Sequence, residues 1–152
     1  MTKILFFDTD CLCSFVWSKT EYLLVELFAN NMQIPIQVYG ELSRVPHIKE
    51  RIDKLIIEGN LSIIDIEIDS DVEDLYINLI KKDSSSKRAV IGKGEAAALA
   101  HTKYKDGILA SNNFRDVKYY VDLYNLKHIA TDQIMKMLVD NGAITVTKAN
   151  EI

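Results

Sequence analysis

The sequence contains few of the residues that mark special classes of protein. Its 152 residues include only two cysteines, two prolines and six glycines. With 48% hydrophobic and 26% charged residues, the composition is that of a globular protein and excludes disordered and collagen-like chains. A chain of this length can bury one sizeable core, so we predict a single domain over residues 1–152.

The two cysteines exclude a disulfide framework and a zinc site. Cys11 and Cys13 are separated by one residue, which strains a disulfide between them. The chain has no second pair of cysteines to complete a zinc site. We therefore expect both to be free thiols.

Long hydrophobic runs are also lacking. No apolar segment approaches the roughly 20 residues of a membrane helix. Asp8 and Asp10 interrupt the first hydrophobic segment too early for a signal peptide. We expect a cytoplasmic protein without a membrane partner. A net charge of -4 disfavours nonspecific nucleic-acid binding over the whole surface, although a basic patch or a bound cation can still recruit phosphates.

Short hydrophobic segments alternate with amphipathic ones along the chain. The predicted strands are residues 3–7, 61–64, 108–110 and 127–130, with an extended segment at 34–38 and an edge strand at 144–146. The predicted helices include two within 15–29 that a polar turn at 18–21 separates, 47–58, 71–82, 113–123, 131–141 and one that begins near Glu95. This alternation, without repeats or linkers, predicts an α/β fold with three α/β/α layers and a mainly parallel central sheet.

Acidic and amide side chains stand near the ends of the predicted strands and the starts of the predicted helices. In chain order they are Asp8, Glu41, Glu95, Asn112, Asn113 and Asp116. Parallel strands open on one edge of a sheet, so these side chains can meet there. Clustered carboxylates repel one another unless a cation offsets their charge. Oxygen ligands without histidine or cysteine favour Mg2+ or Mn2+ over zinc.

Four segments resemble, in order and over nearly the whole chain, the motifs of the PIN domain family of metal-dependent ribonucleases, which includes the VapC-type toxins. They are ILFFDTD at 4–10, IPIQVYGEL at 34–42, GKGEAAALA at 92–100 and ILASNN at 108–113. Asp8, Glu41 and Glu95 match the acids of the first three motifs. The fourth segment departs from the pattern, because asparagines stand where an acid is expected and Asp116 follows three or four residues later.

The resemblance implies a PIN-like fold and hydrolysis of RNA phosphodiester bonds with the help of Mg2+ or Mn2+. It further implies an RNA substrate, and it is compatible with a small antitoxin protein as partner and with a homodimer. The site residues that it suggests are Asp8, Glu41, Glu95 and Asp116 as catalytic and metal-binding acids, Asn112 and Asn113 as further metal ligands, and Asp10 and Ser111 as supporting residues.

Each acid also has a purely structural explanation. Glu95 can complement a helix dipole, and Asp8 can cap the helix after the first strand. Asn113 and Asp116 have the spacing of a capping box, in which Asp116 only serves the start of a helix. Glu41 can be a solvated helix residue. Taken singly, Asp8, Glu41 and Glu95 are better explained by these structural roles, and for Asp116 the two explanations are equal. Taken in family order, the acids favour the site.

Two other functions stay open. A noncatalytic PIN-like module that binds RNA or protein is compatible with the missing fourth acid. A haloacid dehalogenase-like phosphatase would use Asp8, Asp10 and Ser111, but it leaves Glu41 and Glu95 without a role. The basic segment at residues 81–88, ahead of the Glu95 helix, could grip substrate phosphates or simply be a solvated loop.

Overall fold

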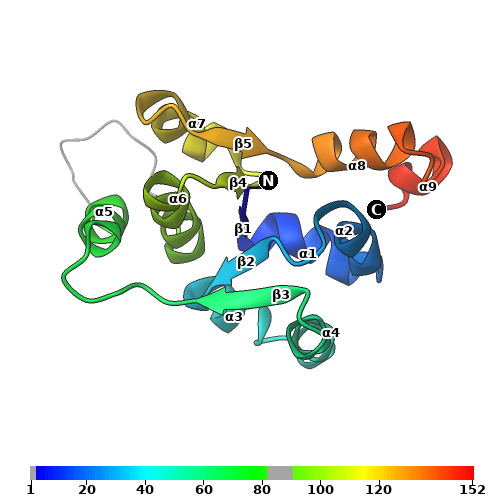
Figure 1. The fold of residues 1–152 in the computed structure, drawn as a ribbon, viewed down its shortest axis with the longest axis horizontal. Helices are drawn as coiled ribbons and strands as arrows, with labels where there is room; N and C mark the ends of the chain where they lie inside the picture. Colours follow the sequence, from blue (N-terminus) through cyan, green and yellow to red (C-terminus); the bar gives the residue numbers. More distant parts are fainter. Residues whose placement is uncertain (1–2, 82–90) are drawn as a thin grey trace.

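The computed structural model describes residues 3–81 and 91–152, which contain a five-stranded sheet in the order β3-β2-β1-β4-β5 (Figure 1). All neighbouring strands are parallel. The strands are β1 (Leu5–Phe7), β2 (Met32–Pro35), β3 (Leu61–Ile64), β4 (Ile108–Ala110) and β5 (Lys127–Ile129). The predicted α/β class with a parallel central sheet is confirmed.

Helices fill the connections between the strands. The first four are α1 (Thr9–Trp17), α2 (Glu21–Phe28), α3 (Ile36–Leu42) and α4 (Pro46–Ile57). They are followed by α5 (Asp71–Ile80), α6 (Lys93–Lys105), α7 (Phe114–Leu123), α8 (Thr131–Asp140) and α9 (Val146–Asn150). Within residues 3–81 and 91–152, none of these helices is long and apolar enough to cross a membrane.

The side chains of β1 divide the core into two halves. Leu5 and Phe7 are buried on one face of the sheet with residues of α1, α2, α4 and α8. Phe6 points to the other face and packs with α5, α6 and α7. Side chains of a strand normally alternate in this way between the two faces of a sheet. Apolar residues on both faces are typical of a sheet that helices cover on both sides. Figure 1 shows the resulting three layers, with α5 and α6 on one side of the sheet and α1 and α2 on the other.

Helix α6 is buried around nearly its whole circumference. Its residues from Ala96 to Ala100 are fully buried, and four of these five are alanines. Small side chains let the helix lie close to its neighbours, and it contacts α3, α5, β1, β2 and β4. The first turn of this central helix carries Glu95. Core packing therefore holds the backbone of that acid in place.

Three predicted segments differ from the structure. The helical region predicted from residue 15 already begins at Thr9, where Asp8 caps α1. The extended segment predicted at 34–38 ends at Pro35, which adopts an extended conformation, and α3 begins at Ile36. The predicted edge strand at 144–146 is wrong. There the Thr145 hydroxyl accepts a hydrogen bond from the Lys148 backbone N–H at 3.2 Å and caps α9 instead.

Two other expectations concern the thiols and the basic segment. Cys11 and Cys13 are free thiols, as predicted, with Cys11 buried in the core. Of the basic segment, only Lys81 belongs to the described residues, so the expectation for 81–88 lies otherwise outside them.

Candidate functional site

The two central strands mark a place where ligands bind in sheets of this kind. The chain passes from β1 outward to β2 and β3, then returns to β4 on the other side of β1. In open parallel sheets, ligands bind beyond the strand ends where the direction of the connections reverses in this way. Asp8 follows β1 and Ser111 follows β4, and the Asp8 backbone N–H donates to the Ala110 carbonyl at 2.9 Å. The strand order therefore brings the first and fourth motifs together.

Asp8 is a buried carboxylate with one unpaired oxygen. Its side chain is 1% exposed, and its Oδ1 caps α1 by accepting from the Cys11 backbone N–H at 2.9 Å. No atom among the described residues forms a hydrogen bond with Oδ2. Burial raises the pKa of Asp8 to about 7; the charges of Glu95 and Asp10 also raise it, whereas the Ser111 hydroxyl and the Cys11 amide lower it.

Glu41 reaches the same place from α3. Its Oε2 accepts a short hydrogen bond from the hydroxyl of Thr9, which is the first residue of α1 and follows Asp8 directly. This bond joins α3 to α1 beside the end of β1. One hydrogen bond between side chains thus connects the segment of the second motif to the segment of the first.

Glu95 in the first turn of α6 is half-buried and surrounded by negative charge. Its Oε1 accepts from Asn113 Nδ2 at 3.1 Å, whereas its buried Oε2 has no hydrogen-bond partner among the described residues. Burial is the main reason that the pKa of Glu95 is raised. The carboxylates of Asp116, Asp10 and Glu41 raise this pKa as well, whereas the Asn113 hydrogen bond lowers it. Glu95 therefore lies within electrostatic reach of three other acids.

Asn113 links Glu95 to Asp116. Its Nδ2 donates to Asp116 Oδ2 at 2.6 Å, in addition to its bond with Glu95. Asn113 is the N-cap residue of α7, but its side chain makes no capping hydrogen bond. The capping pair that the spacing allowed is therefore not formed. Asp116 turns back toward the strand end, where the Asn113 backbone N–H donates to the buried Ser111 hydroxyl at 3.2 Å.

A small cavity of about 70 Å³ gathers the acids. Its lining residues are Asp8, Thr9, Asp10, Glu41, Gly92, Gly94 and Glu95. Gly94 makes room for this arrangement, because a Cβ atom there would lie 3.2 Å from both Glu41 Oε1 and Thr9 Oγ1. Four carboxylates from three elements thus share one cavity at the edge of the sheet.

The chemistry of this cavity fits a divalent cation of the Mg2+ type. The donors are carboxylate oxygens, and Asp8 and Glu95 each keep one buried oxygen without a partner. As they stand, however, the side chains of the described residues include no group of three or more acidic, histidine or cysteine ligands arranged around a metal position. Glu41 is held by Thr9 and Glu95 by Asn113. Cation binding would exchange these hydrogen bonds for ligand contacts.

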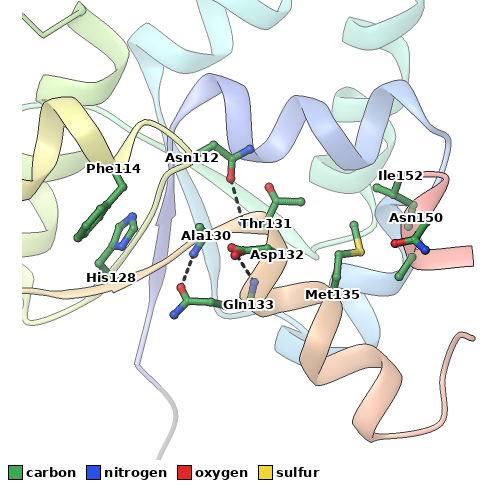
Figure 2. A pocket seen from close by; sticks show the side chains of 11 residues that line it. Asn112, Phe114, His128, Ala130, Thr131, Asp132, Gln133, Met135, Asn150 and Ile152 are labelled. Atoms are coloured by element: carbon green, nitrogen blue, oxygen red, sulfur yellow. Dashed lines mark hydrogen bonds between the residues drawn. The ribbon is translucent and has the colours of Figure 1, made fainter. Parts of the chain in front are cut away.

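Asn112 does not join this group. Its Oδ1 accepts from the Thr131 backbone N–H at 2.8 Å, and its Nδ2 donates to Ser14 Oγ at 3.3 Å. Figure 2 shows Asn112 beside a wider groove at the start of α8. This groove has a volume of about 900 Å³. Further lining residues of this groove include Phe114, His128, Asp132, Gln133 and Met135. The groove has one acid in its lining, so we place the candidate site at the smaller cavity.

Three residues that line the cavity were not predicted as site residues, namely Thr9, Gly92 and Gly94. Thr9 gave no signal, because its role depends on the approach of α3, which lies more than 25 residues away. Gly94 did carry a signal. A glycine inside a helix is unfavourable by about 1 kcal/mol relative to alanine, so its presence next to Glu95 points to a close contact.

Comparisons with known proteins support the fold. No protein-family model matches the chain, and no curated protein matches its sequence. The structure is similar to a chain in the crystal structure of VapBC2 from Rickettsia felis bound to a DNA fragment from their promoter. The match covers 84% of this chain and 98% of that chain, with 23% sequence identity and a TM-score of 0.59. At this identity, the similarity establishes a shared fold.

Proposed function

We propose that this protein is a divalent-metal-dependent ribonuclease. The observation that carries the proposal is the unpaired, buried oxygens of Asp8 and Glu95 in a cavity that holds two further carboxylates. A buried charge without a partner destabilises a protein, so its presence needs a compensating ligand. A divalent cation with oxygen ligands supplies that compensation.

Four acids have distinct places in the proposed site. Asp8 and Glu95 would hold the cation through the oxygens that lack a partner, and Glu41 would join them after release from Thr9. Asp116 would add negative charge from the start of α7. When bound, the cation would neutralise charge on the substrate phosphate and activate the attacking water.

Electrostatics explain why such an enzyme would depend on the cation even for binding RNA at this site. Among the residues that the structure describes, the cavity is lined by four carboxylates and by no arginine or lysine. A phosphodiester would be repelled there in the absence of metal. A cation reverses the sign of this local interaction. We therefore expect RNA to reach the cavity only in the metal-loaded protein.

We further propose that the ribonuclease is the toxin of a toxin–antitoxin pair. The resemblance to VapC-type toxins suggests this role, and the fold shared with a chain of VapBC2 supports it. An antitoxin partner and a homodimer belong to this proposal.

Induced expression in bacteria should arrest growth with the wild type and leave growth unaffected with Asp8→Asn. Light scattering of the purified protein would give its oligomeric state.

The experiment that tests the nuclease proposal is a cleavage assay on a panel of end-labelled RNAs with Mn2+, Mg2+ or EDTA. We expect cleavage with either cation, and none with EDTA or with Asp8→Asn. The matched control is Asp122→Asn, which removes the same charge from an exposed carboxylate paired with Lys118 at 2.8 Å. Cleavage that persists both in EDTA and in the Asp8→Asn variant would contradict the proposal.

The same assay separates the two alternatives. A noncatalytic module would bind the labelled RNA without cutting it. A phosphatase of the haloacid dehalogenase type would instead release phosphate from small phosphate monoesters. That alternative has no use for Glu41 and Glu95, which the structure brings to the same cavity as Asp8.

A further inference from the structure

The Asn113 side chain occupies an unusual position between two carboxylates. A single amide nitrogen, Nδ2, donates to Glu95 Oε1 at 3.1 Å and to Asp116 Oδ2 at 2.6 Å. The two acids come from different helices, α6 and α7. Both hydrogen atoms of one amide group are thus directed at two acceptors that would otherwise repel each other.

The orientation of this amide follows from its surroundings. With the side chain reversed, the amide oxygen would face two carboxylate oxygens, which is an unfavourable contact. The backbone of Asn113 is held separately, because its N–H donates to Ser111 Oγ at 3.2 Å. The side chain can therefore leave the two acids by rotation, without movement of the strand end.

We propose that the Asn113 amide takes the place of a cation between Glu95 and Asp116. In the metal-free protein it holds the two carboxylates together, and on metal binding it turns away or presents its oxygen instead. This inference rests on the proposed function, since it names the residue that competes with the cation in the same site. Asn113 is a positioning residue in this scheme.

The proposal predicts opposite effects on metal-free stability and on metal affinity. Asn113→Asp would replace a donor by a third carboxylate, so the metal-free protein should lose stability. The same change would add a charged ligand and remove the competing amide, so the cation should bind more tightly. The added carboxylate produces both changes by its charge, so Asn113→Ala, which removes the amide without adding charge, is needed to test the bridge itself.

The test compares wild type, Asn113→Asp and Asn113→Ala, with Asn112→Asp as the matched control. Asn112→Asp adds the same charge one residue away and keeps the oxygen that accepts from the Thr131 N–H. Thermal unfolding in EDTA at pH 8 gives metal-free stability. Calorimetric titration with Mn2+ gives affinity. In a third measurement, Mg2+ is added while the side-chain amide signals of the asparagines are followed by NMR.

For Asn113→Asp we expect a metal-free Tm lower by about 3–6 °C and Mn2+ affinity about tenfold higher. Asn113→Ala, which adds no charge and should fold even if the aspartate variant does not, should lower the metal-free Tm by about 2–4 °C without weakening Mn2+ binding. Asn112→Asp should change neither quantity. Mg2+ should shift the Asn113 side-chain signal and leave the Asn112 signal in place.

Two sets of results separate this inference from the proposed function. Suppose that wild type binds Mn2+, that Asp8→Asn does not, and that Asn113→Asp matches wild type in both measurements. The inference is then overturned and the proposed function stands. If neither wild type nor Asn113→Asp binds Mn2+, the proposed function and the competition with metal both fail. The metal-free Tm then decides the bridging role, which an unchanged value for both Asn113 variants overturns.

Discussion

The groove beside Asn112 and the acidic cavity, whose Glu95 accepts from Asn113, differ in size and in charge. The groove beside Asn112 is wide, about 900 Å³, and polar groups at its edge bond to one another, as the Ala130 N–H does to Gln133 Oε1 at 2.8 Å. The cavity beyond Asn113 measures about 70 Å³. It is lined by four carboxylates, and two of them keep a buried oxygen without a partner.

Volume alone therefore does not identify a site. A satisfied polar group has no remaining preference for a ligand, whereas an unpaired buried carboxylate favours any cation that can reach it. The groove beside Asn112 provides a large surface, whereas the acidic cavity contains carboxylates whose charge is not compensated. Substitutions on the two sides should therefore affect different quantities, with cation affinity changing only on the acidic side.

The largest effect is expected from Asp8→Asn. The variant keeps the side-chain oxygen that caps α1, because asparagine is as good a helix cap as aspartate. It loses the charge at the centre of the acidic cavity. Since even substitution of an outer partner of a metal ligand costs about 10–100-fold in affinity, we expect Mn2+ affinity to fall by about 100-fold or more. Calorimetric titration would measure it, and unchanged binding would contradict the assignment of the site.

The same variant should be more stable than wild type in the absence of metal. The pKa of Asp8 rises from its ordinary value of 3.8 to about 7 because the carboxyl is buried. The folded state therefore binds this proton more tightly than the unfolded state, and stability is lost as pH rises from about 4 to about 7. The loss amounts to ~4 kcal/mol at most.

Thermal unfolding of both proteins in EDTA, between pH 4 and pH 8, would measure this difference. The buried His101, whose pKa is lowered to about 4 by burial, is present in both proteins. Its own pH dependence should therefore cancel in the comparison. We expect Asp8→Asn to gain stability over wild type as pH rises, with a plateau above about pH 7. A constant difference across the range would contradict the raised pKa.

The next largest loss of Mn2+ affinity and RNA cleavage is expected from Asp116→Asn, and it should be nearly as large as that of Asp8→Asn. The side chain turns toward the strand end and raises the pKa of Glu95, so its charge reaches the cavity. We expect Mn2+ affinity and RNA cleavage to fall by about tenfold or more. Asp122→Asn on the same helix provides the control. Wild-type affinity in Asp116→Asn would show that Asp116 serves only as the partner of Asn113.

Gly94→Ala should have a still smaller effect on the cavity. The added Cβ would lie 3.2 Å from Glu41 Oε1, Thr9 Oγ1 and a Val38 methyl carbon, so these groups must shift by a few tenths of an ångström. We expect cation affinity to fall by about threefold to tenfold. The helix preference of alanine, about 1 kcal/mol, should offset the crowding in unfolding experiments.

The control for this variant is Gly40→Ala. Gly40 lies in α3 next to Glu41, and its added Cβ would meet no atom within 4 Å. It should therefore raise stability by about 1 kcal/mol and leave Mn2+ affinity unchanged. Equal affinities for the two alanine variants would show that the space at Gly94 is not needed by the site.

The smallest effect on metal binding is expected at the groove beside Asn112. Asn112→Ala removes the oxygen that accepts from the Thr131 N–H at the start of α8. The free energy of unfolding should fall by about 1 kcal/mol, as it does on loss of a helix cap. This corresponds to a decrease in Tm of about 2–4 °C. Mn2+ affinity should stay at the wild-type value. A clear loss of affinity would place Asn112 in the metal site after all.

Much of the fold followed from the sequence because hydrophobic periodicity reports burial locally. The apolar run before Asp8 and the segment at 61–64 became β1 and β3, and the helix predicted at 47–58 became α4. The sheet edge as the place of the acids also followed, since parallel strands all open on one side. One error lay where a single cap decided between strand and helix, as Thr145 does at the start of α9.

The tertiary structure alone decided which side chains of the candidate site meet. Asn112 and Asn113 are identical neighbours in the sequence, yet one bonds to the start of α8 and the other to Glu95 and Asp116. The hydrophobic pattern of the sequence is sufficient to place the acids and amides at the strand ends. Which of them face one cavity depends on how α1, α3, α6 and α7 pack across the sheet, and those contacts join residues that are tens of positions apart. Local periodicity carries no information about such pairings, because it records which face of an element is buried and not which element packs against that face.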